Sequence, residues 1–227
     1  MQALRRKTET LKKPIKLDAY TPEEERANVL THFPGVVFGI IGVYLALSSN
    51  AANYQAWSTA VFFLTCIVLY ASSTLYHLVK AKKQKLLFKK LDHISIYLLI
   101  AGTFTPFCWG VLGNEAIGKN LLIAVWAIAA LGTIFKIFFT GRFEFISLLS
   151  YLGMGWLGYL MFGRLGEVMG NQAVNYMLYG GLCYTGGVAF YLMRKLKYHH
   201  AIWHIFVLGG TAFHAVAILQ VLDFTRA

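Results

Sequence analysis

The sequence predicts an all-α membrane protein, a bundle of seven transmembrane helices in one domain. Two observations support this prediction. First, 57% of the 227 residues are hydrophobic, only 14% are charged and the mean hydropathy is +0.56, whereas about a quarter of the residues in a soluble domain are charged. Second, several apolar stretches have about the 20 residues that a helix needs to cross a hydrocarbon core of about 30 Å. A soluble fold is therefore excluded.

The predicted spans follow the apolar runs along the chain. These runs lack the alternation of polar and apolar residues found in barrel strands, and a helix satisfies its own backbone hydrogen bonds in lipid. We expect helices over residues 31–50, 57–79, 93–112, 120–139, 144–162, 174–193 and 201–222. Residues 1–30 then form a basic cytoplasmic arm and helix entrance, residues 31–222 the transmembrane domain, and residues 223–227 a short external tail.

Local signals refine this outline. Thr21, Pro22 and three glutamates are typical of a helix start, with Thr21 as N-cap and Pro22 at the first helical position. Pro106 predicts a kink late in the third span. The first thirty residues lack the apolar core of a cleaved secretion signal. The three cysteines are scattered through separate apolar runs without a CxxC pair, which indicates small buried side chains rather than a disulfide or metal framework.

The net charge of +11 is distributed unevenly between the two ends of the predicted bundle. Of the 21 Lys and Arg residues, all but Lys119, Arg164 and Arg226 fall in the N-terminal arm or near the even-to-odd helix connections. The positive-inside rule therefore predicts a cytoplasmic N-terminus and an external C-terminus. Anionic lipid of the inner leaflet, rather than nucleic acid, is the expected partner of these basic loops.

Polar side chains from three predicted helices converge at the cytoplasmic end. His200 and His204 lie one turn apart at the start of the last span, and Ser73 and His77 lie one turn apart at the end of the second. Asp92 precedes the third span, where it is expected to be an N-cap. Because ionisable residues in membrane segments usually face a partner or a cavity, this common depth predicts a site.

Three imidazoles, from His77, His200 and His204, would form a tripod for tetrahedral Zn²⁺ with one position open to water. Zinc lowers the pKa of water toward about 7, Asp92 could then act as a base, and Ser73 could donate to a developing oxyanion. Nitrogen ligands without a thiolate favour zinc over copper or iron. The alternative is a polar plug that only locks the helices together.

The remaining histidines receive other assignments. His214 lies ten residues after His204, roughly 15 Å deeper, and is expected to make a buried polar contact within the bundle. His93 and His199 are expected at the interface. His32, with Asn28, is expected to tie the entrance of the first helix to neighbouring loops.

Four ordered motifs resemble those of the hemolysin III group of the progestin and adipoQ receptor family, which is related to the adiponectin receptors. They are Glu25-x-x-Asn28-x-x-Thr31-His32, Ser73-x-x-x-His77, Leu91-Asp92 and His200-x-x-x-His204. The resemblance implies a seven-helix bundle with a cytoplasmic N-terminus, zinc held by His77, His200 and His204, and Asp92 and Ser73 beside it. The short N-terminal arm and brief outer loops depart from the receptors and argue against hormone binding.

These features lead to a hypothesis of a zinc-dependent intramembrane hydrolase of a lipid amide or ester, ceramidase-like, in the bacterial cytoplasmic (inner) membrane. The resemblance implies the ceramidase-type chemistry, while the open tripod motivates hydrolysis. One alternative is a non-enzymatic receptor or regulator of membrane state with a structural zinc. Another is a pore-forming cytolysin, which the family name alone suggests, and a haem site is a more distant one. The substrate and the oligomeric state are not predicted.

Overall fold

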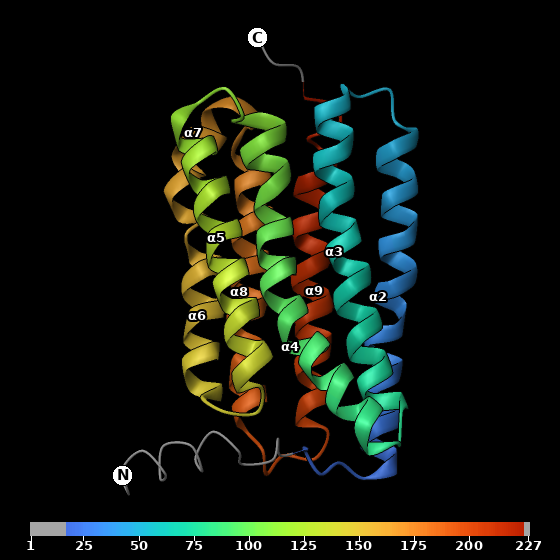
Figure 1. Cartoon of the computed structure of the whole chain (residues 1–227). Coiled ribbons are helices and arrows are strands. Elements are labelled where there is room, and N and C mark those ends of the chain that lie inside the picture. The colour runs from blue at the N-terminus through green and yellow to red at the C-terminus, as the bar shows by residue number, and fades with distance from the viewer. Residues whose placement is uncertain (1–16, 225–227) are drawn as a thin grey trace, which may run out of the picture.

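The computed structural model describes residues 17–224, and the described chain is all-helical (Figure 1). The helices run side by side along one axis, and α2 begins at the opposite end of the bundle from the end of α9 (Figure 1). The elements are α2 (Pro22–Ser48), α3 (Asn53–Leu78), α4 (Lys82–Thr105), the π-helical η1 (Pro106–Val111), α5 (Ala116–Phe139), α6 (Glu144–Trp156), α7 (Tyr159–Met169), α8 (Asn171–Leu192) and α9 (His199–Leu219).

Within residues 17–224, six helical segments are long and apolar enough to cross a membrane: α2, α3, α4 with η1, α5, α6 with α7, and α9. Their outer faces carry large apolar side chains such as Ile40, Leu131 and Phe138, which are 56%, 67% and 72% exposed. A surface of this kind suits lipid and not water. A multi-pass membrane protein is therefore confirmed. The seventh crossing stays a prediction, because α8 has the length of a span but begins with Asn171 and Gln172 and is rich in glycine and tyrosine.

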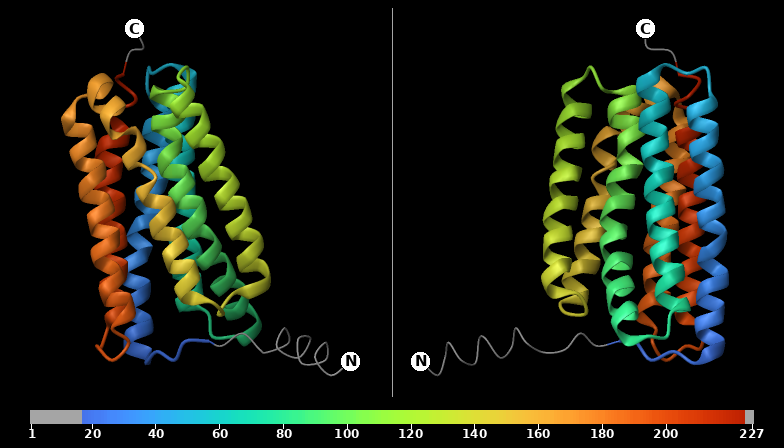
Figure 2. Two further views of the ribbon diagram at one scale, coloured as in Figure 1. Left: turned by 90° about the vertical axis from the view of Figure 1, so that its left-hand side faces the viewer. Right: turned by 45° about the vertical axis from the view of Figure 1, so that its right-hand side comes forward.

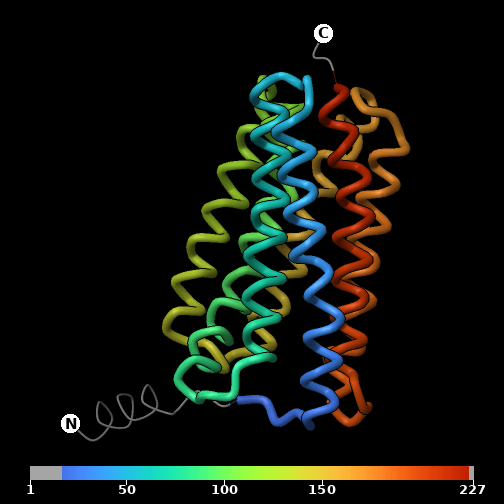
Figure 3. Tube along the Cα trace, turned by 90° about the vertical axis from the view of Figure 1, so that its right-hand side faces the viewer, coloured from blue at the N-terminus to red at the C-terminus, as the bar shows by residue number. Residues whose placement is uncertain are grey.

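The helices differ in how much of their surface other helices cover. About two thirds or more of the spans in α3 and in α4 with η1 is buried, whereas α2, α5 and α6 with α7 are 28% buried. The helix α2 packs between α3 and α9 (Figure 3), and α5 lies on the side of the bundle away from α2 (Figure 2). The helices α3 and α4 thus form the interior of the bundle, against which the outer helices pack.

The start of α2 is the one that the sequence predicts. Thr21 Oγ1 accepts a hydrogen bond from the backbone N–H of Glu24 at 3.3 Å, and Glu24 Oε2 accepts one from the Thr21 N–H at 2.9 Å. This capping box satisfies two backbone donors. The second carboxylate oxygen of Glu24 accepts from the backbone N–H of Tyr198 at 3.2 Å. One glutamate therefore fixes the first turn of α2 and the residue before α9 together.

The third helix differs from its prediction at the start. It begins at Lys82, eleven residues before the predicted start, so Asp92 lies within α4 and is not an N-cap. The reason is that Lys, Gln and Leu favour helix whether or not they lie in lipid, so the helix extends past the apolar run that marks the membrane. At Pro106, which has no N–H, the α-helix changes to the π-helix η1, and the hydroxyl of Thr105 donates to the Ala101 carbonyl at 2.9 Å.

One end of the bundle collects the basic residues. The segment before α2 and the α3–α4, α5–α6 and α8–α9 connections all lie at this end, which is the lower end in Figure 1. We call it the basic end. Residues 1–16 of the predicted arm and residues 225–227 of the predicted tail lie outside the described residues.

Candidate metal centre

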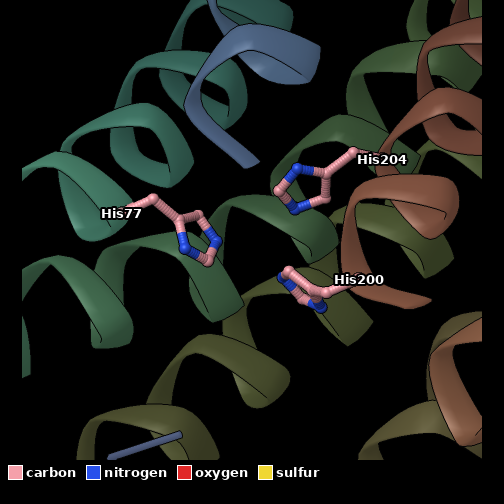
Figure 4. A group of neighbouring side chains, drawn as sticks. All are labelled: His77, His200 and His204. Carbon is pink, nitrogen blue, oxygen red and sulfur yellow. The ribbon is translucent and has the colours of Figure 1, made fainter. Parts of the chain in front are cut away.

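Three histidines meet at the basic end. His77 comes from the last turn of α3, and His200 and His204 come from the first turns of α9 (Figure 4). One side-chain nitrogen from each lies within 4.8 Å of the others. The ring centroids are 5.1 Å apart for His77 and His200, 5.3 Å for His77 and His204, and 4.4 Å for His200 and His204. The structure therefore brings together the three residues that the sequence singled out.

Hydrogen bonds set the tautomers of two of these rings. The Nδ1 of His77 lies 2.6 Å from Glu25 Oε2, and the Nδ1 of His204 lies 3.2 Å from the Asn28 carbonyl oxygen. Because a carboxylate and a carbonyl only accept, each Nδ1 carries the hydrogen and donates it. The Nε2 atoms of His77 and His204 then have free lone pairs.

These free nitrogens fit a metal ion. Among the described residues, the buried Nε2 of His77 and both nitrogens of His200 have no hydrogen-bond partner. Buried polar atoms are normally paired, so three converging rings with unused lone pairs need an explanation. Neutral imidazoles are the ligands that zinc prefers, and a carboxylate or carbonyl on the other ring nitrogen is the usual support. The site therefore has the donors for a three-histidine zinc centre with an open fourth position.

The first turns of α2 support two of the rings. Glu25 accepts from the Nδ1 of His77, as described above, and Thr31 Oγ1 lies 3.1 Å from the Nδ1 of His204. The ring of His32 stacks on His204, with centroids 3.4 Å apart and planes 14° from parallel. In the motif Glu25-x-x-Asn28-x-x-Thr31-His32 the named residues recur at i, i+3, i+6 and i+7. This spacing places them on one face of α2, the face that points toward the histidines. The expected role of His32 and Asn28 in tying the helix entrance to loops is therefore wrong.

Asp92 and Ser73 lie close to this centre without joining the group of three. Asp92 lines the same cavity as His200 and His204, although it comes from the interior of α4 and not from its start. Ser73 is fully buried one turn before His77, and its hydroxyl lies near the Asp92 carboxylate, to which it can donate.

An apolar cavity of about 170 Å³ extends from this centre into the bundle. Its walls come from α4, α6, α7, α8 and α9, and include Phe104, Met161 and Tyr184. At the far end His214 also lines it, with Nε2 3.0 Å from the Met177 carbonyl oxygen. The prediction of a buried polar contact for His214 is confirmed.

A second, polar cavity of about 140 Å³ reaches the centre from the basic end, and we call it the vestibule. His93, His199 and His200 line it together with Arg194. His93 also lines the apolar cavity. The centre therefore lies where an apolar and a polar cavity meet.

The residues before α2 cross the vestibule. The ring of Tyr20 stacks on that of His200, with centroids 5.2 Å apart and planes 29° from parallel, and burial raises the pKa of its hydroxyl. Asp18 pairs with Lys89 at 2.7 Å and accepts from the Tyr76 hydroxyl at 3.0 Å. Burial alone would raise the pKa of Asp18, but these partners hold it below its ordinary value. No pattern in the sequence predicted this contact.

The fold and the centre define the class: an all-helical, multi-pass membrane protein with a buried histidine cluster of metal-ligand geometry near one membrane surface. The model of the family described as "Haemolysin-III related" matches residues 20–215. The chain belongs to this family, and the resemblance seen in its motifs is confirmed. No solved structure gives a significant match.

Named relatives span the bundle as well. The chain is 43% identical over 197 residues to "Hemolysin-3 homolog" of Bacillus subtilis, covering 85% of this chain and 92% of the relative. It is 40% identical over 201 residues to "Hemolysin-3" of Bacillus cereus, covering 87% and 91%. It is 28% identical over 214 residues to the human "Monocyte to macrophage differentiation factor", covering 89% and 88%, which shows a distant relation to the adiponectin receptor-like family.

Proposed function

We propose that this protein is a zinc-dependent membrane hydrolase that cleaves a lipid amide or ester. The observation that supports the proposal is the position of the three histidines, where free imidazole nitrogens lie between an apolar cavity and a polar one. Hydrolysis of a lipid needs both: a dry space for the acyl chain and a path for water and the polar product.

The chemistry follows from the residues around the centre. His77, His200 and His204 would hold the metal, and zinc bound there would supply a Lewis acid that acidifies water and polarises a carbonyl. Asp92 takes the proton of the attacking water as the water oxygen bonds to the carbonyl carbon. The Ser73 hydroxyl donates to the carbonyl oxygen as negative charge develops there. When the C–N or C–O bond breaks, Asp92 returns the proton to the leaving amine or alkoxide.

The proposal includes an orientation. The positive-inside rule places the basic end in the cytoplasm, which puts the centre near the inner leaflet and the end of α9 outside. The named Bacillus relatives support a bacterial cytoplasmic membrane. At that depth the substrate is a lipid that enters sideways from the bilayer, and the basic residues contact anionic headgroups.

Metal analysis of the purified protein tests the zinc part of the proposal. We expect one zinc per chain in the wild type and none in the triple variant His77→Ala, His200→Ala, His204→Ala. Zinc that survives the triple change, or a wild type that binds none in a defined zinc titration, would overturn it.

The variant Asp92→Asn tests catalysis separately from the metal. We expect it to keep its zinc while the release of fatty acid from a lipid amide falls by roughly 10² to 10⁴, the usual contribution of a general base. An unchanged rate with zinc bound would instead favour a receptor or regulator with a structural zinc. The contacts of α2 residues with the rings of His77 and His204 would also suit a structural metal.

The names of the Bacillus relatives favour a second candidate, a cytolysin. Dye release from liposomes separates the two. A pore-forming protein should release dye with or without its three histidines, whereas a hydrolase that lacks them should not.

A further inference from the structure

A lysine lies buried at the mouth of the apolar cavity without an ion-pair partner. Lys136 is in the last turn of α5, is 1% exposed and lines the cavity. Its ammonium lies 5.9 Å from the ring centroid of Tyr151. The ion pairs of the described residues, counted to 4.0 Å, include none with Lys136. A buried ammonium needs a compensating charge, and carboxylates that stay beyond ion-pair distance leave room for an anion of a ligand at Lys136.

Two carboxylates, those of Glu144 and Asp92, line the same cavity and attract the ammonium of Lys136 without coming within ion-pair distance of it. Glu144 begins α6, directly after the short connection that follows α5, and lines the cavity as Lys136 does. Its Oε2 accepts a hydrogen bond from the Tyr191 hydroxyl at 2.9 Å, which fixes the side chain. The cavity mouth therefore has a cation and an anion held apart, each with capacity for a ligand group of opposite charge.

The rest of the cavity indicates what kind of ligand would carry those groups. Beyond the mouth the walls are apolar, with Phe104, Met161 and Phe162 along them. Lys136 is in the last turn of α5 and Glu144 in the first turn of α6, so both lie at the basic end, where the proposed orientation places the headgroups of the inner leaflet. A molecule with two charges of opposite sign at one end and hydrocarbon at the other matches this arrangement, since complementary potentials determine which ligand fits.

We propose that Lys136 and Glu144 form a headgroup site for a zwitterionic amino-phospholipid. The phosphate lies at Lys136 and the ammonium at Glu144, and the parts of the acyl chains nearest the headgroup enter the cavity while the rest stays in the bilayer. Lysine is an established phosphate ligand, acting as a point charge. As a statement about the substrate the headgroup site rests on the proposed function, but lipid binding itself requires neither zinc nor turnover.

Lipid titration of the purified protein, followed by native mass spectrometry, tests the site. The probes are phosphatidylethanolamine, which has both charges, phosphatidylglycerol, which has only the phosphate, and diacylglycerol, which has neither. Lys136→Met should weaken binding of both phospholipids by at least about tenfold, the loss expected for one charge-assisted hydrogen bond, and should leave diacylglycerol unchanged. Glu144→Gln should weaken phosphatidylethanolamine but not phosphatidylglycerol.

Two further variants control for folding and for general charge. Lys136→Arg keeps the cation and should bind both phospholipids as the wild type does. Lys83→Met removes an exposed lysine at the basic end and should change nothing. Wild-type binding by Lys136→Met, or equal affinity for diacylglycerol, would overturn the headgroup site.

Zinc content, measured on the same samples, separates this inference from the proposed function. Loss of lipid selectivity in a protein with full zinc removes the headgroup site and leaves the hydrolase. Selective lipid binding by a protein that binds no zinc supports the headgroup site and removes the zinc-dependent hydrolase.

Discussion

The carboxylate of Glu25 offers the sharpest test of the metal centre, because it contacts a proposed ligand without being one. Its Oε2 accepts from the Nδ1 of His77 at 2.6 Å, and its Oε1 lies 2.6 Å from the ammonium of Lys85. Replacing it with glutamine keeps the size and an accepting oxygen but removes the charge. The hydrogen bond to the ring then becomes a neutral one, and the ring loses the charge that raises the basicity of its free nitrogen.

The structure sets the size of the effect. The Glu25 side chain is 20% exposed and that of His77 is 0% exposed, so solvent screens the pair only weakly. Changes to carboxylates that support a metal-bound histidine reduce metal affinity by about 10- to 100-fold, which is about 1.4–2.8 kcal/mol. We expect Glu25→Gln to weaken zinc binding by this amount, measured by competition with a chromophoric chelator on the purified protein.

A neighbouring residue supplies the matched control. Glu23 lies in the same first turn of α2, and its side chain is exposed to solvent. Glu23→Gln changes the net charge equally and should leave zinc affinity within about twofold of the wild type. If Glu25→Gln also stays within that range, the carboxylate does not support a metal ligand, and the reasoning from ring tautomers fails.

Two further predictions concern stability. Because its ion pair with Lys89 holds the pKa of Asp18 below the ordinary value, the pair stabilises the protein at neutral pH and is lost as the pH falls through that lowered pKa. Asp18→Asn should therefore lower stability at pH 7 by less than about 1 kcal/mol, since Asp18 is 39% exposed. The difference in denaturant midpoint should begin to shrink below about pH 4, the ordinary pKa range of Asp, and vanish once the pH lies below the lowered pKa; a difference that does not shrink with falling pH refutes it. Gly35→Ala places a methyl group into the ring of the fully buried Tyr70 and should lower the free energy of unfolding in detergent by about 1–3 kcal/mol. Gly209→Ala, which has open space around it, should lower it far less. Equal losses in the two variants would contradict the packing argument.

The sequence predicted the location of the centre because depth in a membrane can be read from chain position. A helix rises 1.5 Å per residue and alternate helices run in opposite directions, so residues at matching ends of successive spans share a level. That argument placed His77, His200 and His204 together. It failed for the local role of Asp92, because helix propensity continued α4 beyond the apolar run.

The same argument could not find residues whose importance depends on direction around a helix axis. Glu25 was explained as an acid at a helix start, but the rotation of α2 turns it toward His77. Lys136 was expected near the inner edge, yet it is buried without an ion pair. Tyr20 lies before the first span in a segment without a pattern, and only the folded chain places it over His200.

The sequence by itself determined the class of the protein, the helix ends at which polar residues gather, and the histidines that meet there. These three features follow from hydrophobicity and from the rise of a helix per residue, and both can be read from position along the chain. Only the tertiary structure decided which carboxylate supports which ring, which charges remain unpaired, and which cavities reach the centre. Those depend on how the helices rotate and pack against one another, and packing joins residues with no fixed relation in sequence.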